Sequence, residues 1–352
     1  MALMAAVKAL ALFSGGLDSS LAARVVMAQG VEVEAVQFVT PFCNDLLLAD
    51  PQAHAERIRR KYGITVILED ISPGYLRLLH APRHGFGKNF NPCIDCKILM
   101  LSRAKEMLAE RGASFLVTGE VLGQRPMSQR RDTLNVIERD SGTRSLLLRP
   151  LCAQLLKETE AERQGWVDRA KLLRFSGRGR SQQLALAAQF GITDFPAPAG
   201  GCTLADPILS RRIAMFYSAD SPVPVGEISV TDIRLLLLGR HFRLPGGGWI
   251  ILGRDQRENE AIVKLVAEDD ILFDMEDWPG PTAVLRRGAS CYPEEEARQA
   301  ALHHAGALLL RYGRPMPQGF AVPPVTWRHG GRSGLFVPSA AAEEVLRGWA
   351  LL

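Results

Sequence analysis

The segment Ser14–Ser20 combines the residue types that bind a phosphate group. It follows an apolar stretch typical of a strand and opens a stretch typical of a helix, so backbone N–H groups and the positive helix end face one anion. The glycines allow close backbone approach, the hydroxyls donate, and Asp18 can orient Mg²⁺. The alternative is an ordinary glycine-rich turn before a capped helix. The candidate binding residues are Ser14, Gly15, Gly16, Asp18, Ser19 and Ser20.

Cysteines form a second candidate site. Cys93 and Cys96 stand at the start of a predicted helix, where residues three apart share a face and where the helix end favours thiolate over thiol. Cys202 follows a Pro/Gly-rich segment that can bring a third sulfur to the pair. The alternative is two core cysteines. The other three, Cys43, Cys152 and Cys291, are expected to be small buried residues.

Strands and helices alternate through the first part of the chain, which predicts a doubly wound α/β domain with a parallel sheet. The expected strands are 7–13, 31–39, 64–68 and 114–118, and the expected helices are 18–29, 53–62, 95–111, 155–166 and 181–191. A Pro/Gly linker near 222–226 then leads to a smaller α+β module, with strands near 233–238, 249–252 and 271–273 and a helix at 294–312. The predicted domains are therefore 1–217 and 222–352.

Bulk composition excludes several classes of protein. No run approaches the ~18 apolar residues of a membrane span. Six cysteines in 352 residues do not resemble a secreted disulfide framework, so a reducing cytoplasm is expected. Residues 121–180 carry 13 Lys+Arg against 7 Asp+Glu, whereas residues 221–352 carry 14 against 16. A footprint for a polyanion therefore belongs to the middle of the chain.

The phosphate segment Ser-Gly-Gly-Leu-Asp-Ser-Ser resembles the signature of PP-loop (N-type) ATP pyrophosphatases. The resemblance spans about residues 7–212 and implies cleavage of ATP between its α- and β-phosphates, with an adenylate formed on the substrate. It places Phe38 and Gly119 near the nucleotide. Arg149-Pro150-Leu151 followed by Lys157 is similar to a family element whose lysine reaches a nucleotide phosphate. The basic loop 176–181 is a further candidate phosphate contact, and Gln124, Arg125 and Gln129 are candidate substrate contacts.

The cysteines are similar to those of tRNA-thiolating members. The 2-thiouridylases carry cysteines at positions that Cys96 and Cys202 match, and another group holds a [4Fe–4S] cluster on three cysteines that Cys93, Cys96 and Cys202 match, with one iron left open. The accessory Cys-x-x-Cys pairs of that group are missing here. Two alternatives remain: a Cys96/Cys202 disulfide–persulfide relay without metal, or zinc with His80 or His84 as the fourth ligand.

The resemblance thus implies an ATP-dependent tRNA sulfurtransferase that needs ATP, Mg²⁺ and a sulfur donor, either sulfide or a persulfide carrier. One alternative is a PP-loop ligase acting on another acceptor. Another is a non-catalytic protein that binds tRNA or carries sulfur. Segments around 253–260 and 279–287 resemble the RNA-binding module of NFACT proteins, for which a folding or dimerisation role is the rival. The oligomeric state is left open.

Overall fold

The computed structural model describes residues 7–197 and 203–351. The chain divides into two compact units, Met1–Ser210 and Arg211–Leu352, and each is considered by itself. Across the described ranges, no helix combines the length and the apolar character needed to cross a bilayer. The functional domain ranges 1–217 and 222–352 stay predictions.

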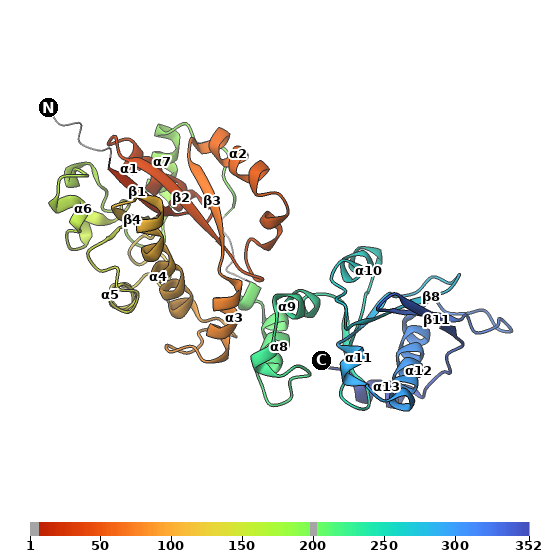
Figure 1. Ribbon diagram of the computed structural model, residues 1–352. Helices are drawn as coiled ribbons and strands as arrows, with labels where there is room; N and C mark the ends of the chain where they lie inside the picture. Colours follow the sequence, from red (N-terminus) through yellow and green to blue (C-terminus); the bar gives the residue numbers. More distant parts are fainter. Residues whose placement is uncertain (1–6, 198–202, 352) are drawn as a thin grey trace. The chain divides into compact units, whose positions relative to one another are not determined.

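The first unit is a five-stranded, all-parallel sheet in the order β3-β2-β1-β4-β5, with helices on both faces (Figure 1). This confirms the predicted doubly wound α/β fold. The strands are β1 Lys8–Leu12, β2 Glu32–Val39, β3 Thr65–Asp70, β4 Phe115–Thr118 and β5 Leu147–Leu148. The helices are α1 Leu17–Met27, α2 Pro51–Tyr62, α3 Ser72–His80, α4 Cys93–Arg111, α5 Arg131–Asp140, α6 Glu160–Arg163 and α7 Ser181–Gln189.

Alternation along the central strand explains the two layers of helices. Ala9 and Ala11 of β1 face a core that contains α1, α2 and α7, whereas Leu10 faces a core built with α4 and α5. A strand buried on both faces reads as a continuous apolar run. Because all strands are parallel, the segments that follow them meet at one edge of the sheet, which is where α/β proteins bind ligands.

The second unit is a six-stranded antiparallel sheet in the order β11-β10-β8-β9-β7-β6, packed on α12. This confirms a smaller α+β module. Its strands are β6 Arg240–Arg243, β7 Trp249–Leu252, β8 Ile271–Met275, β9 Ala283–Arg286, β10 Val325–His329 and β11 Arg332–Phe336. The remaining helices are α8 Pro207–Phe216, α9 Val230–Leu236, α10 Gln256–Val263, α11 Gly288–Cys291, α12 Glu295–Tyr312 and α13 Glu343–Trp349.

Two predicted elements are wrong. The strand expected near 233–238 lies largely in helix α9, because the Ser229 hydroxyl caps the helix and the buried Asp232 returns the bond to the Ser229 N–H. The helix expected at 155–166 is reduced to the single turn α6. Thr159 and Glu162 form a capping box at its start, and Gly165 follows it with a φ of 69°.

Candidate active site at the carboxyl edge of the parallel sheet

The predicted phosphate loop connects β1 to α1 at the carboxyl edge of the sheet. Gly15 adopts a φ of 76°, a conformation that favours glycine. The Ser19 hydroxyl donates to the Gly16 carbonyl at 2.9 Å and accepts from the Ser14 N–H at 3.2 Å, which fixes the curvature of the loop. Ser20 is fully buried, and its hydroxyl bonds to the Gly16 carbonyl at 3.1 Å. Ser20 therefore supports the helix start, and Ser14 is exposed on the loop with its hydroxyl donating to Ser19 Oγ at 3.2 Å.

Asp18 lies in the first turn of α1 and is partly buried. Its Oδ2 accepts a hydrogen bond from Gln124 Nε2 at 2.9 Å, and its buried Oδ1 has no partner among the described residues. Burial raises the pKa of Asp18, and the Gln124 hydrogen bond and the charges of Arg180 and Arg125 oppose that rise. The two arginines therefore lie within electrostatic reach of the phosphate loop.

The oxygen atoms beside Asp18 suit a magnesium ion. Gln124 Oε1 is also buried and has no hydrogen-bond partner in the described part of the chain. Carboxylate and amide oxygens are the ligands that Mg²⁺ prefers, and it is usually held by only one or two protein groups and by substrate phosphates. Asp18, with Gln124 as its neighbour, thus fits the predicted cation at the level of its donor atoms.

Gly119 follows β4 and packs against the start of α1. A Cβ at this position would lie 2.5 Å from the carbonyl carbon and oxygen of Asp18 and from the Ser19 nitrogen. The Phe38 side chain is only 6% exposed and belongs to the core, and its carbonyl accepts from Asn44 Nδ2 at 3.0 Å. Its place near the nucleotide stays a prediction.

The Cys-x-x-Cys pair occupies the first turn of α4, also at the carboxyl edge. Cys93 is the first residue of this helix, and its thiol donates to Asn91 Oδ1 at 2.7 Å. Lys97, directly after Cys96, forms an ion pair with the buried Glu120 at 3.4 Å. Since Glu120 follows Gly119, two adjacent residues contact the helix that carries the cysteines and the phosphate loop. Sequence reasoning missed Lys97. Its position one turn after Cys93 is the signal that places it on the same helix face as that cysteine.

The residues from Thr203 onward lie beside the loop that precedes Cys93. Cys202 itself lies outside the described residues, but Thr203 Oγ1 donates to the Phe42 carbonyl at 3.0 Å. Asn89 Nδ2 donates to the Ala205 carbonyl at 2.7 Å, and the Phe90 N–H to Ser210 Oγ at 2.8 Å. The stretch after Cys202 is therefore bonded to the loop that precedes Cys93.

The candidate metal ligands lie in different surroundings. Within residues 7–197 and 203–351, no group of three His, Cys, Asp or Glu side chains is arranged to hold a metal ion. Of the histidines weighed for zinc, His84 bonds Asp140 through Nε2 at 2.9 Å and His80 is exposed at the end of α3. The cluster, the relay and the zinc site all stay predictions.

The remaining cysteines correct one expectation. Cys152 is fully buried, as predicted, and burial raises the pKa of its thiol to about 11. Cys291 is half-buried, whereas Cys43 is exposed just after β2. Cys43 is therefore wrongly assigned as a buried residue. It follows Phe42 in a tight turn closed by paired bonds between Thr40 and Cys43, which presents its side chain to solvent.

Arg149 of the Arg-Pro-Leu element lies in a buried network of ion pairs. Arg149 is 2% exposed and bonds Glu120 through Nε at 2.9 Å, and its Nη1 bonds Glu138. Burial opposes ionisation of Glu120, but the charges of Lys97 and Arg149 outweigh it and lower the pKa of Glu120 to about 2. Lys157 is exposed and lines a cavity whose lining contains no residue of the phosphate loop.

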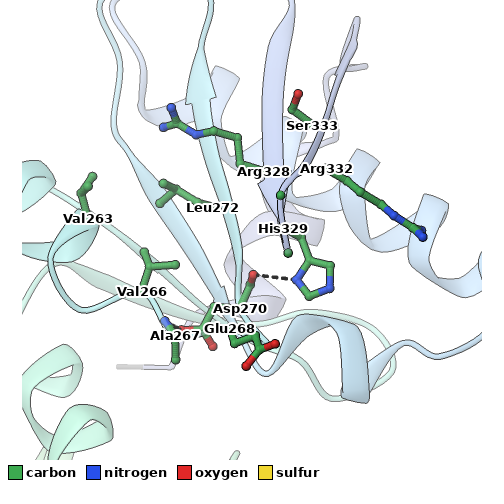
Figure 2. Close-up of a pocket in the computed structure, with 12 residues that line it drawn as sticks. Val263, Val266, Ala267, Glu268, Asp270, Leu272, Arg328, His329, Arg332 and Ser333 are labelled. Atoms are coloured by element: carbon green, nitrogen blue, oxygen red, sulfur yellow. Dashed lines mark hydrogen bonds between the residues drawn. The ribbon is translucent and has the colours of Figure 1, made fainter.

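The second unit has a shallow cavity of about 490 Å³ between the loop that follows α10 and the β10–β11 turn (Figure 2). His329 turns toward that loop and its Nδ1 bonds the Asp270 carbonyl at 3.1 Å, while Arg332 extends away from it. The Asp270 carboxylate is occupied by Arg286, and Arg328 pairs with Asp274. The cavity therefore offers few uncompensated charges.

Comparisons with known proteins divide the chain in the same way. Residues 4–160 match the model of the family described as thiamine biosynthesis protein (ThiI). This match lies within the N-terminal unit and leaves more than half of the chain outside it. Residues 239–349 match the NFACT protein RNA binding domain, so both predicted resemblances are confirmed.

Curated relatives match about a third of this chain. A probable tRNA sulfurtransferase of Methanosarcina acetivorans is 32% identical over 121 residues, which cover 32% of this chain and 27% of the relative. A tRNA-specific 2-thiouridylase MnmA of Pelobacter propionicus is 31% identical over 112 residues, which cover 30% of this chain and 31% of the relative. The chain thus spans about a third or less of the length of these relatives.

Two solved structures are similar at greater distance. A 4-thiouridine synthetase–RNA complex with bound ATP is 24% identical, with a TM-score of 0.37, over 53% of this chain and 41% of that chain. The U34-tRNA thiolase NcsA from Methanococcus maripaludis with its [4Fe-4S] cluster is 16% identical, with a TM-score of 0.29, over 61% and 68%. The ATP, the RNA and the cluster belong to those proteins.

Proposed function

We propose that this protein is an ATP-dependent tRNA sulfurtransferase. The proposal rests on the segment Gly119–Glu120, which contacts both predicted sites. Gly119 packs on Asp18 in the phosphate loop, and the next residue, Glu120, is paired with Lys97 beside Cys96. A nucleotide at the loop and a sulfur atom at the cysteines would then act on one substrate atom, which is the requirement for activating an oxygen and replacing it.

In the proposed first step, the carbonyl oxygen of a tRNA base attacks the α-phosphorus of ATP and pyrophosphate leaves. The loop N–H groups and the arginines Arg125 and Arg180 stabilise the charge that develops on the phosphates. Asp18, oriented by Gln124, would hold Mg²⁺, which would supply positive charge to offset the charge of the phosphates. Lys157 as a phosphate contact stays a prediction from the resemblance alone.

In the proposed second step, sulfur replaces the activated oxygen and AMP leaves. Cys93, Cys96 and Cys202 are the residues that would bring sulfur. Sulfide would displace AMP directly, whereas sulfur from a persulfide carrier would need a second cysteine thiol to cleave the S–S bond, leaving a disulfide for an external thiol to reduce. A [4Fe–4S] cluster held by these thiolates would supply iron that binds sulfide. The relatives named as tRNA sulfurtransferase support tRNA as the acceptor, and the domain similar to the NFACT RNA-binding module supports an RNA contact in the second unit.

The test is an anaerobic reaction of the purified protein with unmodified tRNA, ATP, Mg²⁺ and sulfide, followed by mass spectrometry of the nucleosides. The expected result is a thiolated nucleoside formed with one pyrophosphate per sulfur. Pyrophosphate release without a thionucleoside would favour a ligase acting on another acceptor. Binding of tRNA without pyrophosphate release would favour a non-catalytic carrier.

A further inference from the structure

A second cavity in the first unit lies apart from the phosphate loop. It has a volume of about 510 Å³ and lies beside β5, the edge strand of the sheet, between α5 and the segment that leads into α6. Its lining includes no residue of the phosphate loop or of the cysteine turn, and neither Arg125 nor Arg180. The cavity is therefore a separate feature of the unit.

The cavity carries an excess of positive charge. Its three carboxylates are compensated: Glu138 pairs with Arg149, and Glu158 and Glu162 pair with Arg169. Three of its cations have no ion pair with any described carboxylate, and Arg131 makes only a hydrogen bond, to the Leu155 carbonyl. These three cations are Arg131, Arg144 and Lys157. An uncompensated group of this kind attracts an anion.

Arg149 also lines this cavity, and its guanidinium is buried beside it. It is one of the lining residues, it is 2% exposed, and its Nη2 has no hydrogen-bond partner among the described residues. A buried guanidinium N–H without a partner is costly, and Arg is the side chain best suited to phosphate oxygens. The donor set therefore matches a phosphate group better than it matches a neutral ligand.

We propose that this cavity binds a backbone phosphate of the RNA substrate. The exposed arginines and lysine reach a phosphate from solvent, and the site has no glycine-rich cradle of the kind that holds a nucleotide. The cavity also falls within residues 121–180, where basic residues outnumber acidic ones. The proposal rests on the proposed function in one respect, namely that the substrate is RNA.

The experiment uses the full-length protein with Arg144→Glu, an exposed position, and Asn135→Asp, which adds a charge to the cavity wall at constant shape. The matched control is Arg60→Glu on α2, at the opposite edge of the sheet, where Arg60 is 74% exposed (Figure 1). Affinity for unmodified tRNA is measured by fluorescence anisotropy at several salt concentrations. Affinity for ATP is measured separately, and thermal melting confirms folding.

Both cavity variants are expected to weaken tRNA binding by about tenfold, and Arg144→Glu should reduce the salt slope by about 0.7–0.9 for the lost phosphate contact. ATP affinity and the control should be unchanged. Weakened ATP binding with unchanged tRNA binding would assign the cavity to a nucleotide phosphate and overturn the RNA proposal. Variants that match the control in both assays would also overturn it. Because binding is measured without turnover, failure of the thiolation assay leaves this result interpretable.

Discussion

Gly119 and Asp18 are in backbone contact, so closely that a methyl group on Gly119 would lie 2.5 Å from the Asp18 carbonyl oxygen. Gly119 does not have a positive φ, and the requirement for glycine is therefore one of space and not of backbone conformation. The contact involves backbone atoms on both sides, which no change of side-chain rotamer relieves.

Gly119→Ala is accordingly expected to displace the phosphate loop, to abolish measurable ATP binding and to lower the free energy of unfolding by about 1–3 kcal/mol. Calorimetry with ATP and thermal melting check both effects. Gly74→Ala is the control, because its Cβ meets only ordinary contacts, 3.5 Å from Leu99, within α3. Full ATP affinity in Gly119→Ala would show that the loop tolerates the displacement.

Gln124→Ala should raise the Mg²⁺ concentration that half-saturates pyrophosphate release by roughly 10–100-fold, because Asp18 loses the group that orients it. The pKa of Asp18 is already raised by burial, and the lost hydrogen bond lowers it in the native protein. The acid limb of the pH profile should therefore move to higher pH in the variant. A shifted limb separates this role from simple loss of stability, and an unmoved limb with normal Mg²⁺ dependence would contradict it.

Arg149→Met should destabilise the first unit by about 3–5 kcal/mol, since it leaves Glu120 buried with Lys97 as its remaining cation. Denaturant unfolding measures this change. The pKa of Glu120 is lowered to about 2 in the native protein, so its ionised form stabilises the fold above pH ~4.5 and the stabilisation is lost as pH falls toward 2. Arg149→Met should lose most of that pH dependence, and a variant as stable as the native protein would exclude a structural role for Arg149.

Alkylation of the native protein with iodoacetamide at pH 8 should spare Cys152 and modify Cys43. The Cys152 thiol has a pKa of about 11 because of its burial, so almost none of it is thiolate, whereas Cys43 is exposed. Peptide mass spectrometry after a time course gives both rates, and unfolding in urea should make them similar. Equal rates in the native protein would show that the region around Cys152 opens readily.

The sequence predicts those parts of the site that lie on one continuous segment. Ser14–Ser20 carries its donors, glycines and helix start together, so the sequence alone predicts a phosphate-binding loop. The Gln124–Asp18 bond joins residues 106 positions apart, and the Lys97–Glu120 pair depends on how α4 meets the end of β4. Such pairs are set by packing of the sheet. The strand predicted near 233–238 is wrong for a different reason, because the Ser229/Asp232 capping box that begins α9 is a local signal that the apolar run outweighed.

The phosphate loop also has a consequence for synthesis of the chain. Its own residues leave the ribosome first, but its wall at Gly119 and its partner Gln124 follow about a hundred residues later. A nascent chain that ends before β4 therefore has the nucleotide motif without the surface that shapes it. ATP binding by the nascent chain should therefore begin only when Gln124 has emerged from the ribosome.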